Sequence, residues 1–104
     1  MMRRILVAGN WKMNKTPAET EAFIDAFLST IEGVGRVEIA LFPPCTSLDR
    51  AGRLLAGTAV RLGGQDLHFE TSGPYTGSIS ASMLSACGCR YVLVGHSERR
   101  KLFG

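Results

Sequence analysis

The chain has 104 residues and a mass of 11.2 kDa, with 45% hydrophobic residues, 20% charged residues and a net charge of +3. This length predicts one small domain, residues 1–104, and the composition is that of a globular protein. No apolar run approaches the roughly 18 residues of a membrane helix, and no secretory signal is evident. Basic residues are scattered apart from Arg99–Lys101, which argues against nucleic-acid binding. We therefore expect a soluble cytoplasmic protein.

Strands and helices are predicted to alternate along the chain. Four short apolar runs favour strands, at residues 5–8, 37–42, 59–62 and 91–94. The first and last runs are continuously apolar, which is typical of strands in a parallel sheet that is covered on both faces.

The first helix has a strong start signal. Thr16 suits the cap, Pro17 the first helical position, and Glu19 stands three residues after the cap. Gly33 and Gly35 are predicted to end this helix. Its inward face comprises five apolar residues: Phe23, Ile24, Phe27, Leu28 and Ile31.

Two further helices are predicted. One begins near Thr46 or Ser47 and ends before Gly57, and its inward face comprises Leu48, Ala51, Leu54 and Leu55. Another runs from about Ser80 to Cys87, and the last residues of the chain look like the first turn of a fourth. This alternation predicts an α/β fold built from right-handed βαβ units around a parallel sheet.

The remaining conspicuous residues have ordinary explanations. Cys45, Cys87 and Cys89 are an odd number without a metal-site spacing, so we expect buried free thiols and no metal. His68 is expected in a loop or at the surface. Packing roles are expected for Trp11, Met13, Met83 and Leu84. The long connection from about residue 63 to 79 is unusual, and long loops are often functional or lie at interfaces.

Polar residues follow the first and the last predicted strands. Asn10 and Lys12 come after the first strand, and His96 and Glu98 after the last. Because parallel strands point one way, these residues converge at the edge where α/β proteins bind ligands. A lysine and an asparagine there can stabilise a developing oxyanion, and a neutral histidine can donate or relay a proton.

Each of these residues also has a plain structural interpretation. A lone lysine is usually a solvated charge, a lone histidine is often structural, and an asparagine often forms a turn. The placement of the residues after two parallel strands is what favours function. No nucleotide-binding fingerprint and no serine nucleophile elbow is found in the sequence.

Two segments, Ala8–Asn14 and Val94–Arg100, resemble signature segments of the triosephosphate isomerase family. Gly63–Asp66 and Gly73–Gly77 are also similar, and the resemblance covers essentially the whole chain in order and spacing. It implies a TIM-barrel fold. It also implies the interconversion of dihydroxyacetone phosphate and glyceraldehyde 3-phosphate through an enediolate, without a cofactor, in glycolysis and gluconeogenesis.

The resemblance also implies roles for individual residues. Lys12 would hold the triose phosphate substrate electrostatically, and Asn10 would help to polarise its reacting oxygen. His96 would be the neutral electrophile, with Ser97 and Glu98 as supporting residues.

In this family the loop after the third strand reaches into the partner of a homodimer. Thr76, flanked by Tyr75 and Gly77, would then lie at the interface. Ser78 stands where the family often has glutamate, so an acidic partner for Arg99 is missing.

The resemblance further implies a truncated barrel. The chain matches three βα units, a fourth strand and the start of a fourth helix, whereas the whole fold needs about 200–250 residues or more. The segments with the glutamate base, the lid and the phosphate loops have no counterpart, so little or no activity is expected from this chain alone. Glu98 is a weak candidate for a substitute base.

Three hypotheses follow. The chain is a piece of a triosephosphate isomerase, a self-assembling half-barrel that binds phosphate, or a non-catalytic scaffold. Self-association is expected in each case where the open strand edges must be covered, and a homodimer is favoured.

Overall fold

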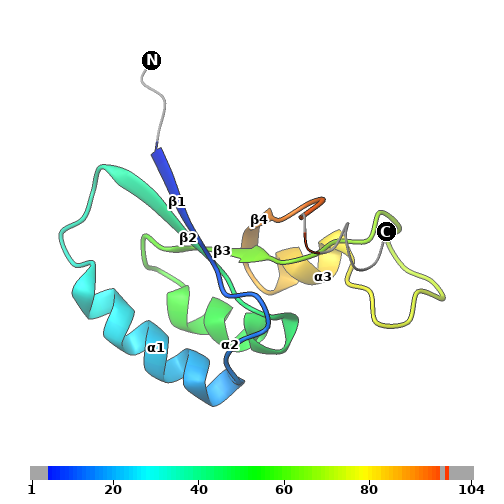
Figure 1. Cartoon of the computed structure of the whole chain (residues 1–104), viewed down its shortest axis with the longest axis horizontal. Coiled ribbons are helices and arrows are strands. Elements are labelled where there is room, and N and C mark those ends of the chain that lie inside the picture. Colours follow the sequence, from blue (N-terminus) through cyan, green and yellow to red (C-terminus); the bar gives the residue numbers. More distant parts are fainter. Residues whose placement is uncertain (1–4, 97, 99–104) are drawn as a thin grey trace.

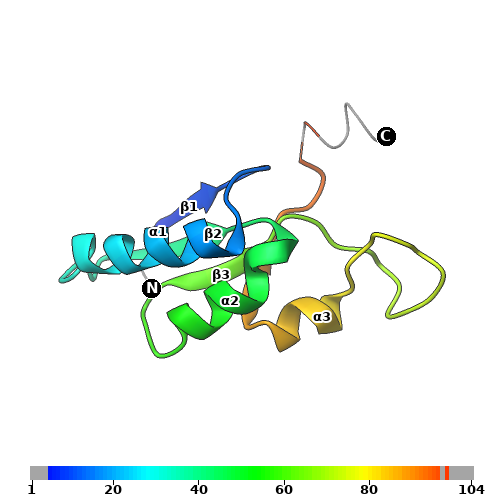
Figure 2. The ribbon, with the colours of Figure 1, turned by 90° about the horizontal axis from the view of Figure 1, so that it is seen from below.

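The computed structural model describes residues 5–96 and residue 98. Its elements alternate as predicted: β1 (Ile5–Asn10), α1 (Pro17–Thr30), β2 (Val37–Phe42), α2 (Cys45–Leu55), β3 (Arg61–Gly64), α3 (Ala81–Ala86) and β4 (Cys89–Val92). The strands form one parallel sheet in the order β1-β2-β3-β4. Figure 1 shows α1 and α2 together on one side of this sheet, and the perpendicular view in Figure 2 agrees. The predicted α/β class and parallel sheet are confirmed; the predicted start of a fourth helix lies outside the described residues.

The caps of α1 and α3 are made by the residues that the sequence indicated. The Thr16 hydroxyl accepts from the Glu19 N–H at 3.3 Å, and the Glu19 carboxylate accepts from the Thr16 N–H at 3.0 Å. Ser80 caps α3 by accepting from the Met83 N–H at 3.3 Å. Short polar side chains at these positions satisfy backbone donors that the first turn leaves unpaired.

The predicted start of α2 is displaced by one or two residues. The helix begins at Cys45, and its cap residue Pro44 makes no side-chain hydrogen bond. Ser47 is fully buried instead, where its hydroxyl accepts a hydrogen bond from Thr20 of α1 at 2.9 Å. A polar residue that resembled a cap therefore joins two helices.

Strands β3 and β4 differ from their predicted bounds by two residues each. The predicted ranges 59–62 and 91–94 become Arg61–Gly64 and Cys89–Val92. Gly63 and Gly64 belong to β3, where they pair with Tyr91 and Val92 of β4. Their lack of a side chain lets the Phe42 ring and the Leu84 side chain approach the strand closely. Glycines that looked like turn residues are therefore packing positions.

The core lies between the sheet and the helices on its covered face. It comprises eight buried apolar residues: Ile24, Leu41, Leu48, Ala51, Leu55, Val60, Leu62 and Leu84. The predicted inward faces of α1 and α2 supply most of the helical contribution. None of the helices in the described residues is long and apolar enough to cross a membrane.

The prediction that the first strand is covered on both faces is wrong for this chain. Ile5, Leu6 and Val7 of β1 are 64%, 44% and 51% exposed. Strand β1 is an edge of the described sheet, and α1 and α2 lie on one side of that sheet. Because successive side chains point to opposite faces, these residues show that both faces of the edge strand remain in contact with solvent.

Some predicted packing residues also lie at the surface. All three cysteines are free thiols, but the prediction that they are buried is wrong. Cys45 is exposed, and Cys87 and Cys89 are only half-buried. Met13 is 93% and Met83 52% exposed, because Met13 lies in the loop after β1 and Met83 on the outer face of the short helix α3. By contrast, Leu84 is buried as predicted. Trp11 packs edge-on against Phe23 at 5.2 Å between ring centroids.

Candidate functional site

The loops after β1 and β4 meet at one edge of the sheet. The Lys12 ammonium nitrogen lies 2.6 Å from Glu98 Oε1, although the two residues are far apart in the sequence. His96 lies in the same group, with Nε2 4.0 Å from the same carboxylate oxygen. The side chains of Lys12 and Glu98 are 57% and 50% exposed, so the pair is open to a ligand from solvent.

The loop after β1 holds Lys12 in an unusual backbone conformation. Its φ is +55°, in the left-handed region that non-glycine residues seldom adopt. The Asn10 side chain contributes to this turn, because its Oδ1 accepts from the Lys12 N–H at 2.9 Å. Because this contact uses only the oxygen of the Asn10 amide, its NH₂ group can donate a hydrogen bond to a ligand.

The backbone of Glu98 orients the His96 ring. The Glu98 N–H donates to His96 Nδ1 at 3.1 Å, so Nδ1 carries no proton. In the neutral ring the proton is therefore on Nε2, the nitrogen that faces Glu98. Ser97, predicted as a supporting residue, lies outside the described residues.

Lys12 controls the charge on Glu98. The hydrogen bond from the Lys12 side chain is the main reason that the pKa of Glu98 lies below its usual value of 4.5, and the charges of Lys12 and His96 act in the same direction. Partial burial opposes this effect. Glu98 is therefore ionised at neutral pH and balances the charge of Lys12.

A mainly apolar cavity of about 200 Å³ lies beside Lys12. It is lined by residues of the loops after β1 and β3 and of α2 and α3: Lys12, Met13, Pro44, Cys45, Leu48, Gln65, Asp66, Ile79 and Leu84. Within residues 5–96 and 98, no three His, Cys, Asp or Glu side chains are grouped so as to hold a metal ion.

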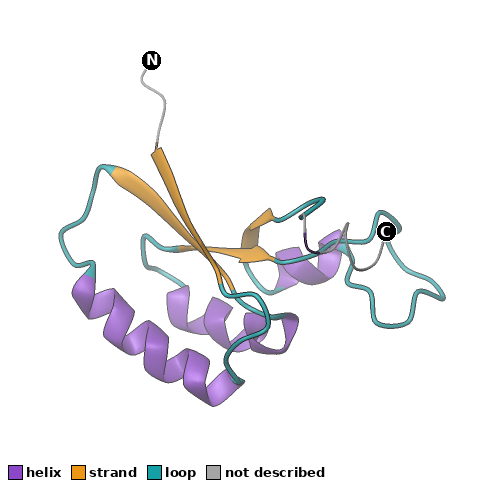
Figure 3. Ribbon diagram, viewed as in Figure 1, coloured by secondary structure: helices purple, strands orange, loops and turns teal. Residues whose placement is uncertain are grey.

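The predicted interface residues lie elsewhere, on the long loop between β3 and α3. This loop projects away from the sheet (Figure 3). Its residues Thr76 and Gly77 are exposed, and the Tyr75 ring stacks on His68 at 4.0 Å between centroids. The structure does not bring these residues to the Lys12–Glu98 pair. Ser78 is exposed on the same loop, and its proposed relation to Arg99 lies outside the described residues.

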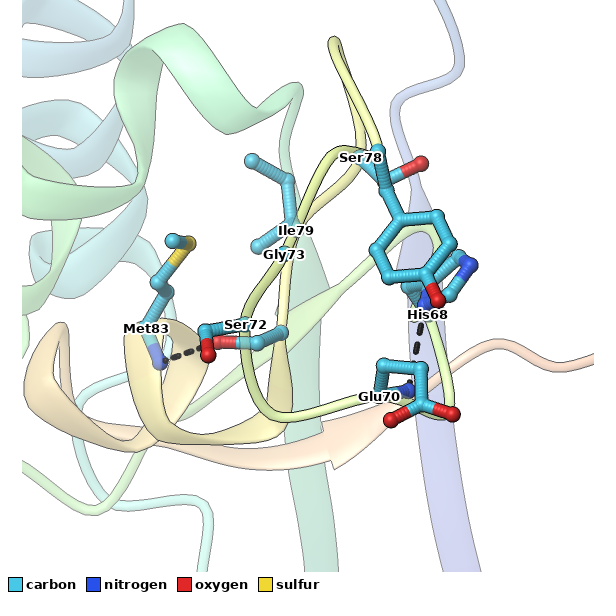
Figure 4. A pocket seen from close by; sticks show the side chains of 9 residues that line it. His68, Glu70, Ser72, Gly73, Ser78, Ile79 and Met83 are labelled. Atoms are coloured by element: carbon cyan, nitrogen blue, oxygen red, sulfur yellow. Dashed lines mark hydrogen bonds between the residues drawn. The ribbon is translucent and has the colours of Figure 1, made fainter.

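His68 organises the base of this loop. Its backbone N–H donates to the Ile79 carbonyl at 2.8 Å, and its Nδ1 accepts from the Glu70 N–H at 3.1 Å. Figure 4 shows His68 and Glu70 at the wall of a small hollow, with Ile79 and Met83 on its opposite side. At about 50 Å³ the hollow is too small for a triose phosphate. His68 lies in the connection between β3 and α3, as predicted.

Sequence reasoning did not single out Gln65 as a site residue. Its side-chain amide reaches from the end of β3 and donates to the Lys12 carbonyl oxygen at 2.8 Å. A glutamine directly after a double glycine carries no local signal for such a contact. Only its position next to a strand end placed it near the candidate site.

Comparison with known proteins identifies the family. The family model for triosephosphate isomerase matches residues 5–104. The triosephosphate isomerase of Aquifex aeolicus is 55% identical over 103 residues, which are 99% of this chain and 41% of that protein. The enzyme of Synechocystis is 51% identical over 104 residues, or 99% of this chain and 43% of the relative.

A solved structure agrees with these relatives. The crystal structure of triosephosphate isomerase from Bartonella henselae has a TM-score of 0.89 and 44% sequence identity, and the match covers 97% of this chain and 41% of that one. The four-stranded sheet thus corresponds to part of a TIM barrel, and the chain spans about two fifths of the length of these relatives. The chain belongs to the triosephosphate isomerase family.

Proposed function

We propose that Asn10, Lys12 and His96 form the electrophilic half of a site that isomerises triose phosphates. The substrates would be dihydroxyacetone phosphate and glyceraldehyde 3-phosphate, as family membership suggests. The observation that carries this proposal is the contact of 2.6 Å between Lys12 and Glu98, which joins the ends of β1 and β4 around His96. The required chemistry is stabilisation of negative charge as an enediolate forms.

Lys12 and Asn10 supply positive charge and a hydrogen-bond donor. The half-exposed Lys12 ammonium can hold the substrate phosphate while it stays close to the reacting oxygen. The Asn10 NH₂ group can donate to that oxygen, since Asn10 Oδ1 is already occupied by the Lys12 N–H. Both groups stabilise charge more effectively when water is excluded.

His96 is suited to act as a neutral hydrogen-bond donor. Because its Nδ1 accepts from the Glu98 N–H, a neutral ring presents the Nε2 proton. This proton can be donated to the substrate oxygen and moved between the two oxygens of an enediolate. Glu98 supports the ring through its backbone, and we propose that Ser97 supports the same turn.

Glu98 is poorly suited to act as the base. Its pKa is lowered by the hydrogen bond from Lys12, so its carboxylate takes up a proton less readily than an ordinary glutamate. A positioned base contributes roughly 10²–10⁴-fold to such a reaction. We propose that the isolated 104-residue chain has little or no isomerase activity, because the family's base and lid have no counterpart in its sequence.

An isomerase assay and a binding measurement on the purified chain test this function. We expect turnover near the assay blank. We also expect millimolar 2-phosphoglycolate, whose carboxylate mimics the enediolate, to raise the thermal midpoint. His96→Gln and Lys12→Met should reduce this rise, and Lys15→Met is the matched control. Turnover close to that of a complete family member, abolished by His96→Gln, would contradict inactivity; an unchanged midpoint would contradict ligand binding.

A second candidate function is that of a self-associating, non-catalytic half-barrel. The observation in its favour is the exposed apolar strand β1, with Ile5 64% and Val7 51% exposed. Strand β4 of each chain would pair with β1 of the other, which gives a homodimer with a closed eight-stranded sheet. The loop around Thr76 offers a competing contact.

The three free thiols suit a reducing compartment, so we place the protein in the cytoplasm.

Native mass spectrometry tests this second candidate. A mass near twice 11.2 kDa is expected for the chain, and Val7→Lys at the strand edge should return it to the monomer. The exposed Val34→Lys, in the connection between α1 and β2, introduces the same charge away from both strand edges and is the control. A monomer at micromolar concentration would contradict the half-barrel dimer.

A further inference from the structure

The backbone of Lys12 is held by side chains on both sides. Its N–H donates to Asn10 Oδ1 at 2.9 Å, and its carbonyl oxygen accepts from Gln65 Nε2 at 2.8 Å. With φ at +55°, this residue adopts a conformation that a lysine leaves unless its surroundings hold it there. Asn10 is two residues away and is part of the same turn, whereas Gln65 comes from a different strand.

Gln65 makes a second hydrogen bond that anchors it. The same Nε2 donates to the Phe42 carbonyl oxygen, also at 2.8 Å. An amide nitrogen has two protons, and both are directed at carbonyl oxygens, so only the NH₂ end of the side chain can face this position. The orientation of the amide is therefore determined by its two acceptors.

These contacts connect the ends of three strands. The Phe42 carbonyl, at the end of β2, also accepts from the Trp11 N–H at 3.1 Å, immediately before Lys12. Gln65 follows β3 directly, so its side chain connects β3 with the end of β2 and with the loop after β1. A shift of the loop after β1 would break bonds to both neighbours.

We infer that Gln65 is a positioning residue that keeps the left-handed Lys12 turn in the geometry that directs the Lys12 ammonium toward Glu98 and the substrate. Its action is indirect, since the amide binds the backbone of Lys12 and leaves the ammonium available for ion pairing. The part of this inference that concerns substrate rests on the proposed function. The part that concerns the ion pair rests only on the described contacts.

The test compares Gln65→Met with two reference variants of the whole chain. Met has a similar length and shape but donates no hydrogen bond. Lys12→Met abolishes the ion pair and sets the limit of the effect. Thr58→Val removes a hydroxyl bond of 2.7 Å to the Leu55 carbonyl just before β3, at the opposite end of that strand, and is the control for a merely structural loss.

The readout is the pKa of Glu98, measured by ¹³C NMR titration of its carboxyl carbon. We expect Gln65→Met to raise this pKa toward 4.5, as Lys12→Met does, and Thr58→Val to leave it unchanged. A folded Gln65→Met chain with the original Glu98 pKa would overturn the inference. Because no triose phosphate is involved, this result is independent of whether the site binds substrate.

A measurement on the unsubstituted chain covers the case in which Gln65→Met does not fold. A scalar coupling across the hydrogen bond, between Gln65 Nε2 and the Lys12 carbonyl carbon, is expected by NMR. If this coupling is absent while that to the Phe42 carbonyl is present, Gln65 ties strands together without holding Lys12, and the inference fails.

Discussion

Lys12 and Glu98 neutralise each other at the sheet edge, with 2.6 Å between Nζ and Oε1. Exposed ion pairs of this kind contribute little to stability. Their importance here is that they fix where a positive charge lies relative to His96. A ligand phosphate that arrives at Lys12 competes with Glu98 for the same ammonium.

Removing the Lys12 charge should change the titration of Glu98. Because its folded pKa is lowered, the ion pair stabilises the fold above pH 4.5, and this contribution is lost as the pH falls through the lowered value. Lys12→Met removes this contribution altogether and should raise the Glu98 pKa toward 4.5, as ¹³C NMR titration of the carboxyl carbon measures. Lys15→Met is the matched control, since Lys15 is also left-handed and lies over the Phe23 ring, 5.0 Å from its centroid.

The thiols should differ in reactivity. Burial, together with the neighbouring Cys87, raises the pKa of Cys89 to about 11, whereas Cys45 is exposed. At pH 8 only about one Cys89 side chain in a thousand is then a thiolate, the reactive form. Iodoacetamide followed by peptide mass spectrometry should show Cys89 alkylated more slowly than Cys45, and equal rates would contradict the raised pKa.

At the scale of elements, α1 carries its own start signal, while α2 depends on its surroundings. The Thr16–Glu19 capping box is local and complete. Helix α2 has Pro44 at its cap position without a side-chain hydrogen bond, and its buried face packs against α1 and β3. Most helical stability in proteins comes from such packing rather than from propensity.

Loss of the α1 cap should destabilise the chain. Thr16→Ala leaves the Glu19 N–H without its side-chain acceptor and should cost about 1 kcal/mol in the free energy of unfolding. Thr30→Ala removes only a bond to the Ala26 carbonyl within the last turn of α1 and should change stability by less than about 0.5 kcal/mol. Urea denaturation followed by circular dichroism measures both, and equal losses would contradict the capping role.

A side chain at Gly63 should disturb the contact between β2 and β3. An added Cβ would overlap the buried Phe42 ring, so Gly63→Ala should cost about 1–3 kcal/mol in the free energy of unfolding. At Gly35 no atom lies within 4 Å of an added Cβ, so Gly35→Ala should be close to neutral or stabilising. Thermal melts of both variants measure the two effects. A neutral Gly63→Ala would show that the ring moves aside without loss.

At the scale of the whole molecule, the described sheet has one covered face and two open edges. Strands β1 and β4 are its outer strands, and the apolar side chains of β1 are half-exposed or more. Exposed apolar edges promote association with further strands. We therefore expect the stability of this chain to depend on whether these edges are covered by association.

Self-association should make the stability of this chain depend on its concentration. If β1 and β4 pair between chains, the urea midpoint should rise with protein concentration, because association stabilises the folded state by mass action. The single Trp11, packed on Phe23, reports the transition by fluorescence. Val7→Lys should remove the dependence, and a midpoint that is constant for the unsubstituted chain over a hundredfold range of concentration would contradict the pairing.

Local patterns were sufficient to predict several features from the amino-acid sequence. The alternation of elements, the caps at Thr16 and Ser80, the bounds of β2 and the burial of Leu84 all follow from hydrogen bonds and periodicities within a few residues. The family resemblance, confirmed by the comparison, also lay within short motifs. Such features need no knowledge of how distant segments pack.

Features that depend on distant segments required the folded chain. The exposure of β1, Met13 and Cys45 is set by which faces receive cover. Gly63 lies inside a strand through its pairing with β4, and the Phe42 ring of β2 occupies the space that a side chain at this position would need. The bond from Gln65 to Lys12 spans 53 residues. The amino-acid sequence by itself indicated which chemical groups are available at the strand ends. The packing of the ends of β1, β3 and β4 determined which of those groups touch, because such contacts depend on the register and twist of the whole sheet.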